Sequence, residues 1–256
     1  MLVIKIRNIL KPLFHIIVEP HVKYVVKKTQ EDFLQYKDMY KGKRCFIVAN
    51  GPSLSKNDLD MLYINKEITF GLNRIYVMFD RTEWRPNFYL SQDPSIIRSC
   101  RKEMMESLRN IPKFIKPPGE PWINVKGAIY FNLDYSYGKK RIRPAFGIGK
   151  KGMFVDGRTV TYTAIQLAAY MGFEDIYLLG CDCNYSKGNK IIDINSYADE
   201  RMYNPKKVGM NPDMQYNFMA YKSAKEYADS NAVNIYNATR GGMLEIFERV
   251  DFESLF

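Results

Sequence analysis

Short apolar runs that end in a polar residue recur along the second half of the first hundred residues and again near the end of the chain. Residues 44–49 are mostly apolar and lead into Asn50-Gly51, which is typical of a buried strand followed by a turn. Four further runs share this design, at residues 68–73, 88–93, 175–182 and 233–239. The pattern therefore predicts at least five strands, each with a polar group at its end.

Two stretches with apolar residues at helical spacing stand between these runs, at residues 158–171 and 213–229. Apolar strands alternating with helices indicate the α/β class: a mostly parallel, Rossmann-like sheet with helices on both faces. In such sheets ligands bind in a crevice at the carboxyl ends of the strands. We therefore predict that the polar strand ends converge on one rim: Asn50, Asn73, Asp93, Asp182 and Asn237.

The first 40 residues differ from the rest, and we predict an N-terminal amphipathic helical extension there, followed by a nucleotide-binding α/β domain at residues 41–256. Residues 1–28 mix apolar residues with six Lys and Arg, and their uncharged run is too short to span a bilayer. Such a basic segment is typical of a helix lying in the membrane interface. Packing on the domain, or on a second subunit of a homo-oligomer, are the alternatives.

The formal net charge of +10 favours anionic partners such as nucleotides or phospholipid headgroups. Nucleic acid is not expected, because the basic and aromatic residues form no known nucleic-acid module. Cys45, Cys181 and Cys183 lie in apolar, strand-like runs, and the cysteine spacing matches no zinc pattern. With no secretory signal, we expect reduced thiols and a cytoplasmic protein, peripheral on the inner face of the membrane if residues 1–28 bind there.

The loop Asn50-Gly51-Pro52-Ser53 has the residues of a phosphate-binding turn. Gly51 lets the backbone approach a ligand closely, Pro52 fixes the turn, and Ser53 or Ser55 can cap the helix that follows. The free N–H groups of such a helix start suit a phosphate. The loop is neither a Rossmann glycine fingerprint nor a P-loop, and an ordinary strand-to-helix turn is the alternative.

A second group of polar residues, at 156–162, opens the next predicted helix with Arg158 and Thr161 and suits an anionic group. The basic stretch before it, at 139–151, is either a lid over phosphates or a solvated loop. Asp182 can bind a ribose or a metal, act as a base, or cap a turn. The histidines, His15 and His21, both lie in the N-terminal segment, so neither a histidine triad nor a metal site is predicted.

Taken together, these segments resemble the Maf/MptE-like family, whose members include motility accessory factors, an archaeal pterin diphosphokinase and proteins of surface-polysaccharide loci. The resemblance extends from Lys43 to Phe256. More distantly, the order of motifs is similar to that of bacterial sialyltransferases that use a CMP-activated sugar. The segments that carry the resemblance are residues 50–54, 70–76, 156–160, 171–173, 177–182 and 236–242, together with the strand that ends at Asp93.

The resemblance implies two sets of site residues. The set implied to bind the nucleotide is Asn50, Gly51, Pro52, Ser53, Asn73, Asp93, Thr161, Tyr185, Asn237 and Thr239. The set implied to be catalytic is Arg158, Asp182 and Asp213. One departure is clear: those sialyltransferases use a His as general base ahead of the last long helix, where this chain has Asn-Pro-Asp-Met-Gln at 211–215.

Three functions remain as hypotheses. The first is a glycosyltransferase of bacterial surface-polysaccharide synthesis that moves a nucleotide-activated sugar, such as a CMP-linked one, to a glycan or a lipid-linked acceptor without a cofactor. The second is a diphosphokinase that moves pyrophosphate from ATP to a hydroxymethyl pterin-like compound, with Mg²⁺ held by Asp93 and Asp182. The third is a nucleotide-binding scaffold without catalysis.

Overall fold

A computed structural model describes residues 18–147, 149, 152–184, 197–203 and 213–256 of the chain. An eight-stranded sheet runs through it in the order β10-β9-β8-β1-β2-β3-β4-β5, and every neighbouring pair is parallel. Its strands are β1 (Arg44–Val48), β2 (Thr69–Leu72), β3 (Phe88–Ser91), β4 (Lys113–Ile115), β5 (Ala128–Tyr130), β8 (Asp175–Leu179), β9 (Asn234–Asn237) and β10 (Glu248–Arg249). The predicted parallel α/β fold is therefore confirmed.

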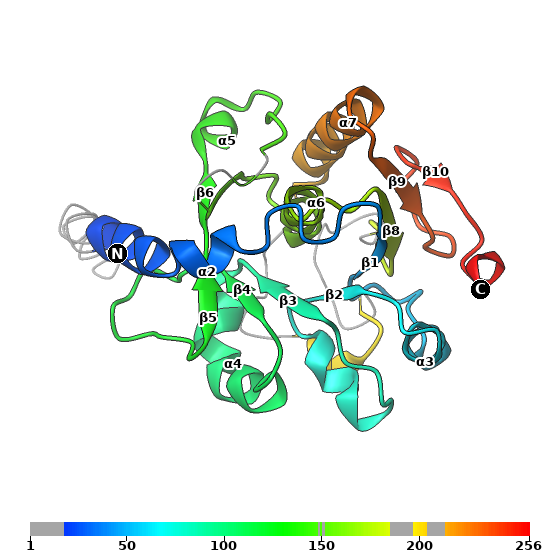
Figure 1. The fold of residues 1–256 in the computed structure, drawn as a ribbon, viewed down its shortest axis with the longest axis horizontal. Coiled ribbons are helices and arrows are strands. Elements are labelled where there is room, and N and C mark those ends of the chain that lie inside the picture. Colours follow the sequence, from blue (N-terminus) through cyan, green and yellow to red (C-terminus); the bar gives the residue numbers. More distant parts are fainter. Residues whose placement is uncertain (1–17, 148, 150–151, 185–196, 204–212) are drawn as a thin grey trace, which may run out of the picture.

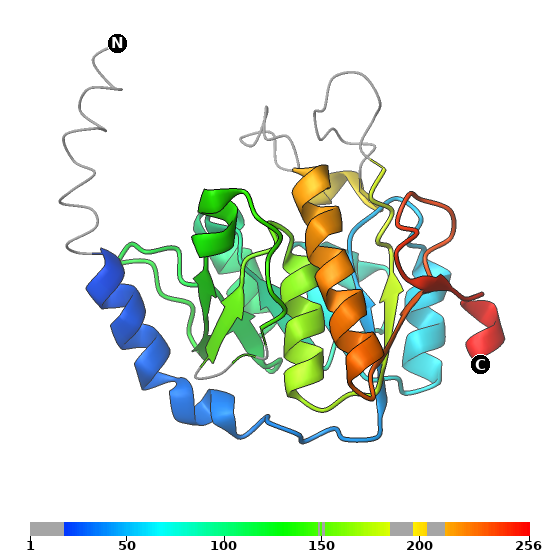
Figure 2. The same ribbon diagram turned by 90° about the horizontal axis from the view of Figure 1, so that it is seen from above.

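Helices cover both faces of the sheet (Figure 1). On one face lie α2 (Gln30–Leu34), α6 (Val160–Tyr170) and α7 (Met214–Ser230), and on the other lie α3 (Lys56–Ile64), α4 (Pro94–Ser107) and the 3-10 helix η1 (Ile75–Asp80). A separate parallel pair, β6 (Asn132–Asp134) and β7 (Met153–Val155), flanks α5 (Ser136–Lys140). Two short 3-10 turns, η4 (Glu200–Met202) and η6 (Glu253–Leu255), lie before α7 and at the C-terminus (Figure 2).

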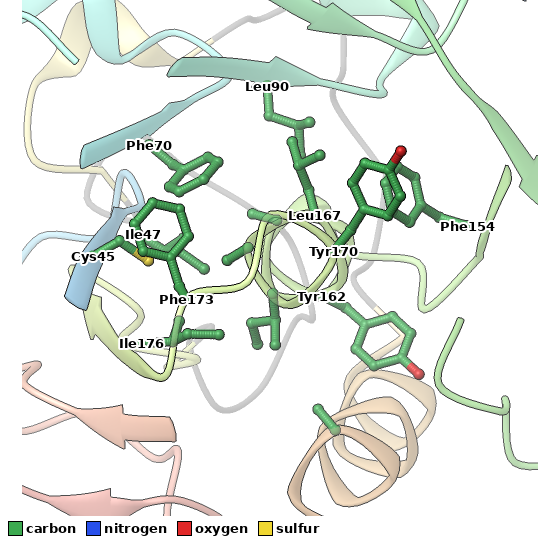
Figure 3. Close-up of a cluster of buried hydrophobic side chains, with 14 of the residues drawn as sticks. Cys45, Ile47, Phe70, Leu90, Phe154, Tyr162, Leu167, Tyr170, Phe173 and Ile176 are labelled. Atoms are coloured by element: carbon green, nitrogen blue, oxygen red, sulfur yellow. The ribbon is translucent and has the colours of Figure 1, made fainter. Parts of the chain in front are cut away.

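The alternation of side chains along each strand explains why the sheet needs a layer on either side. In β1, Cys45 and Ile47 enter the hydrophobic cluster around α6, whereas Phe46 and Val48 enter the cluster beneath α3 and α4. Figure 3 shows the first cluster, in which Phe70, Leu90 and Phe173 surround α6. Most residues of α6 are apolar and nearly all are buried, so it lies between the sheet and α7 at the centre of the core.

The N-terminal part of the described chain covers an edge of the sheet. Residues 18–28 are helical, and the Thr29 hydroxyl accepts a hydrogen bond from the backbone N–H of Tyr130 in the edge strand β5, at 2.8 Å. Phe33 of α2 is fully buried against Phe114 and Phe154. Residues 1–17 of the amphipathic extension predicted for residues 1–40 lie outside the described residues, and the domain boundary at residue 40 stays a prediction.

Among the described helices, none is long and apolar enough to cross a membrane.

Candidate functional site

The sheet order creates one point at which the chain changes direction. From β1 the chain adds strands on one side, through β2 to β5, and later adds β8, β9 and β10 on the other side of β1. In open α/β sheets the crevice at such a switch point, beyond the carboxyl ends of the strands, is where ligands bind. Here the switch lies between β1 and β8, so the loop at residues 50–53 and Asp182 face each other across it.

The two sides of the switch are joined by hydrogen bonds. Ser53 donates its backbone N–H to Asp182 Oδ1 at 3.2 Å and its hydroxyl to Asp182 Oδ2 at 2.8 Å. Asp182 is 9% exposed, and burial raises the pKa of its carboxyl, while the bonds from Ser53 oppose part of that rise. The helix cap belongs to Ser55, which forms a capping box with Asp58 at the start of α3. The sequence left this cap open between Ser53 and Ser55.

The loop approaches β8 so closely that only glycine fits at position 51. The Gly51 N–H donates to the Gly180 carbonyl at 2.9 Å, and a Cβ on Gly51 would lie 1.9 Å from Asp182 Oδ2. Beside it, the Asn50 amide donates to the Leu72 carbonyl at 3.0 Å, and its Oδ1 is buried without a hydrogen-bond partner among the described residues. Pro52 is exposed at the tip of the loop. A ligand that donates a hydrogen bond would satisfy Asn50 Oδ1.

The ends of β2 and β3 supply the next polar residues along the rim. Asn73 adopts a left-handed backbone conformation with φ of 49°, and its side-chain Oδ1 accepts from the Ser91 hydroxyl at 3.3 Å. Asp93 caps α4, because its Oδ1 accepts from the backbone N–H and the hydroxyl of Ser95, both at 2.8 Å. Asn73 thus belongs to a hydrogen-bonded strand end, and the Asp93 carboxylate already serves a helix start.

Arg158 and Asp213 meet at a separate place on the rim. The Arg158 guanidinium forms an ion pair with Asp213 and stacks over the Tyr216 ring at 4.9 Å from the ring centre. Asp213 also caps α7 by accepting from the Tyr216 N–H at 3.2 Å. The backbone N–H of Arg158 donates to Asp156 Oδ1 at 2.9 Å. Asp156 is nearly buried, and this burial raises the pKa of its carboxyl. The sequence did not pair Arg158 with Asp213.

Two of the remaining predicted nucleotide ligands, Asn237 and Thr239, lie on the β8–β9 side. Asn237 and Thr239 are buried and bonded within the chain: the Asn237 amide donates to the Leu244 carbonyl at 2.7 Å, and the Thr239 hydroxyl accepts from the Cys181 N–H at 3.0 Å. Thr161, near the start of α6, is buried. Tyr185 lies outside the described residues.

Sequence reasoning missed two polar groups on the rim. Lys116 directly follows β4, and its ammonium lies 6.0 Å from the centre of the Tyr135 ring. The pKa of Lys116 is lowered, first by burial and then by Arg98, and the nearby carboxylates of Glu120 and Asp156 oppose only part of that shift. The rule that each strand ends in a polar residue would have found Lys116, but a strand of three residues gives no periodic pattern.

The second missed group joins α6 to β3. The Thr163 hydroxyl donates to Gln92 Oε1 at 2.6 Å, next to the end of the strand. A surface pocket of about 390 Å³ lies elsewhere, along β6 and α5, with Asp134, Tyr135, Lys139 and Lys140 in its lining. In the described part of the chain, no three His, Cys, Asp or Glu side chains gather in a way that could hold a metal ion.

These observations define a parallel α/β protein with polar groups gathered at the switch point of its sheet. Residues 10–188 match the family described as 6-hydroxymethylpterin diphosphokinase MptE-like, which is more than half of the chain. The chain therefore belongs to the MptE-like family, as the resemblance of its motifs predicted.

The fold is also similar to the solved structure of a MAf glycosyltransferase from Magnetospirillum magneticum AMB-1. The TM-score is 0.56 at 18% sequence identity, and the match covers 91% of this chain and 39% of that one. The likeness shows a shared fold, and the chain spans about two fifths of the length of that protein. No curated protein matches the chain at a significant level.

Proposed function

We propose that the protein is a glycosyltransferase that binds a nucleotide-activated sugar at the β1–β8 switch point. The observation that carries this proposal is the junction of the loop at residues 50–53 with Asp182, where backbone and side-chain groups meet at the carboxyl ends of two central strands. Asn50 Oδ1, which is buried and has no hydrogen-bond partner in the described part of the chain, supports it, because a base or ribose donor would satisfy that atom. The formal charge of +10 also favours an anionic donor.

Cations beside the rim suit the phosphate that leaves when the sugar is transferred. In this proposal Arg158 stabilises the developing charge on that phosphate, after exchanging its bond to Asp213 for one to the ligand. Lys116, at the end of β4, is a second cation on the same rim. The resemblance of the motif order to sialyltransferases that use a CMP-activated sugar supports a cytidine nucleotide in this proposal, with a glycan or a lipid-linked saccharide of surface-polysaccharide synthesis as the acceptor.

The general base that activates the acceptor hydroxyl is assigned to Asp182 in preference to Asp213. A base works best when its pKa is near the working pH, and burial raises the pKa of Asp182. Both carboxylates accept hydrogen bonds, Asp182 from Ser53 and Asp213 from the start of α7, but of these two only Asp213 is paired with a cation, Arg158. We expect Asp182→Asn to lower the transfer rate by about 100-fold or more, and Asp213→Asn to lower it less.

A thermal-shift series with CMP, CDP, UDP, GDP and ATP, each with and without Mg²⁺, tests the proposal. A ligand that binds the folded state raises its melting temperature. We expect CMP to raise it without metal, and Asn50→Ala to remove that shift. Asn57→Ala, an exposed Asn on the neighbouring helix α3, is the matched control and should keep the shift. A scaffold would show the shift but release no CMP from CMP-sugars with any acceptor.

The family description favours a second function, a diphosphokinase that moves pyrophosphate from ATP to a hydroxymethyl compound. This reaction needs Mg²⁺ to neutralise charge on the migrating group. The ligands expected from the sequence, Asp93 and Asp182, follow β3 and β8, which lie three strand positions apart, on the order of 14 Å, so they do not share one ion. If the melting temperature rose only with both ATP and Mg²⁺, and AMP formed as a product, the protein would be a diphosphokinase and the glycosyltransferase proposal would be wrong.

A further inference from the structure

A small unit made of β6, β7 and α5 extends from the edge of the sheet, beyond the carboxyl end of β5. One residue, Phe131, separates β5 from β6, so β6 continues from the end of β5 (Figure 1). In Figure 2, α5 (green) stands at the same end of the molecule as the start of α7 (orange), where Asp213 lies. The unit therefore stands beside the rim formed by the strand ends.

This unit contains the surface pocket of about 390 Å³. Two large side chains in its lining are exposed, Tyr135 by 39% and Met153 by 48%. A sugar ring has a C–H face that packs on such side chains and hydroxyls that both donate and accept hydrogen bonds. The other lining residues are Leu133, Asp134, Ser136, Lys139 and Lys140, and all but Leu133 are polar.

Tyr135 connects the pocket to the rim. Its ring centre lies 6.0 Å from the ammonium of Lys116, which follows β4. Burial, and then the carboxylate of Asp156, raise the pKa of the Tyr135 hydroxyl. The hydroxyl therefore stays protonated at neutral pH and can donate a hydrogen bond to a ligand.

Cations outnumber carboxylates in the lining of the pocket. Lys139 and Lys140 are exposed, and neither forms an ion pair within the described part of the chain. Asp134 is the carboxylate of the lining, and its Oδ1 accepts from the backbone N–H of Ser136 at 2.8 Å. Two positive charges against one negative charge favour an anionic ligand.

The carboxylates behind the lining do not reverse this balance. Each has a cation beside it: Asp213 with Arg158, Glu120 with Arg98, and Asp156 with Lys116.

The pocket is too far from Asp182 to hold the group that reacts there. In the sheet, β5 lies five strand positions from β8, on the order of 24 Å. A ligand in the pocket is therefore a part of the substrate that is remote from the reacting hydroxyl. Binding energy from such a remote part can hold the rest of the substrate in place.

We propose that this pocket is a subsite for an acidic saccharide unit of the acceptor, a sugar that carries a carboxylate or a phosphate. The C–H face of the sugar packs on the Tyr135 ring, and Lys139 and Lys140 bind its anionic group. Asp134 and Ser136 bind its hydroxyls. The proposal rests on the proposed function only in calling the ligand an acceptor, because this binding requires no transfer.

Binding of small saccharides to the full chain tests the proposal without catalysis. Saturation-transfer difference NMR detects the contact, and isothermal titration calorimetry gives the dissociation constant. We expect glucuronate or glucose 6-phosphate to bind about tenfold more tightly than glucose, and the tighter of the two identifies the anion as a carboxylate or a phosphate. Inorganic phosphate at the same concentration should not displace them, because it has no ring to pack on Tyr135.

Variants separate the ring from the charges. Tyr135→Ala should weaken binding of the acidic sugar about tenfold, whereas Tyr135→Phe should keep it. The double change of Lys139 and Lys140 to Gln should remove the preference over glucose. The matched controls are Tyr63→Ala, a 53% exposed tyrosine of α3, and Lys222→Gln, an exposed lysine of α7. Unchanged melting temperatures will show that the variants are folded.

Four results would overturn the proposal: no binding of either acidic sugar, glucose bound as tightly as they are, full binding in Tyr135→Ala, or an equal loss in Tyr63→Ala. Displacement of the sugar by CMP would place it at the β1–β8 switch point and would overturn the proposal as well.

The failure of this proposal can be told from failure of the proposed function. Tyr135→Ala should keep the rise in melting temperature that CMP causes. If CMP raised the melting temperature but no acidic sugar bound, the subsite alone would be wrong. If an acidic sugar bound through Tyr135 but CMP had no effect, the subsite would stand and the proposed donor would be wrong.

Discussion

Two parts of the strand-end rim use charge in different ways. At the β1–β8 junction, Asp182 is almost buried and holds Ser53 through two hydrogen bonds, next to a backbone contact that leaves no room for a side chain. At the other part, the side chains of Arg158 and Asp213 are 37% and 21% exposed and hold each other. The first part is fixed by the packing of the sheet, whereas the second can exchange its ion pair for a bound anion at small cost.

The largest effect of a substitution on stability is expected at Gly51, in the rigid part of the rim. We expect Gly51→Ala to lower the free energy of unfolding by about 3 kcal/mol, because the new Cβ would lie 1.9 Å from Asp182 Oδ2 and 2.5 Å from the Gly180 carbonyl oxygen. Urea denaturation measures this. Gly241→Ala is the control: its Cβ would meet nothing within 4 Å, and its positive φ costs about 1 kcal/mol. Equal losses would show that close approach is not what position 51 requires.

Ser53→Ala should have the next largest effect on stability. Removing a hydroxyl that donates to a nearly buried carboxylate costs about 1.5 kcal/mol, and the backbone N–H of residue 53 would remain bonded. Urea denaturation of Ser53→Ala beside Ser254→Ala, an exposed serine near the C-terminus, measures the difference. If Ser53→Ala lowered the free energy of unfolding no more than Ser254→Ala does, the β1–β8 junction would not be the rigid part of the rim.

The contrast also separates what the sequence predicts from what it does not. Each polar strand end follows a local apolar run, so the pattern of residues alone was enough to place Asn50, Asn73 and Asp182 on one rim. The bond from Ser53 to Asp182 could not be predicted, because it depends on β8 lying beside β1. Strand order is set by packing of the whole sheet and leaves no local pattern in the sequence.

The short elements were the hardest to predict. The helix predicted at residues 158–171 is α6, Val160–Tyr170. It could be predicted because its apolar residues recur at helical spacing over a long stretch. The three-residue strands β4 to β7 have too few positions for alternation, so Lys116 and the pocket beside Tyr135 went unnoticed. Pairing of Arg158 with Asp213 likewise joins segments far apart in the chain.

Arg158→Ala should change stability little and catalysis much. An ion pair as exposed as this one contributes less than about 1 kcal/mol, so urea denaturation should shift only slightly. Transfer of the sugar should slow by about 100-fold, mostly in kcat, because the charge on the leaving phosphate develops in the transition state.

Asp213→Asn is the control for Arg158, because Asn still caps α7 while the ion pair is lost. If Arg158→Ala lost stability without a loss of kcat, the pair of Arg158 and Asp213 would have a structural role. It would then not be a part of the rim that exchanges its ion pair for a bound anion.

The smallest expected effect is the pH dependence of stability at Asp156, which accepts the backbone N–H of Arg158. Burial raises the pKa of its carboxyl, so the folded chain holds this proton more firmly than the unfolded chain. Its contribution to stability is then present at low pH and is lost as the pH rises through the folded pKa. Asp156→Asn should therefore raise the melting temperature near pH 7, on the order of 2 °C, with no gain near a pH of about 3.5.

Asp60 provides the opposite sign for the same measurement. Hydrogen bonds from Lys56 and Thr82 lower the pKa of its carboxyl, so its contribution is present at neutral pH and is lost on acidification. Asp60→Asn should lower the melting temperature at neutral pH, and the difference from the parent should shrink in acid. If Asp156→Asn lowered the melting temperature at neutral pH, as we expect of Asp60→Asn, the Asp156 carboxylate would stabilise the fold. The part of the rim that holds Arg158 would then be as rigid as the β1–β8 junction.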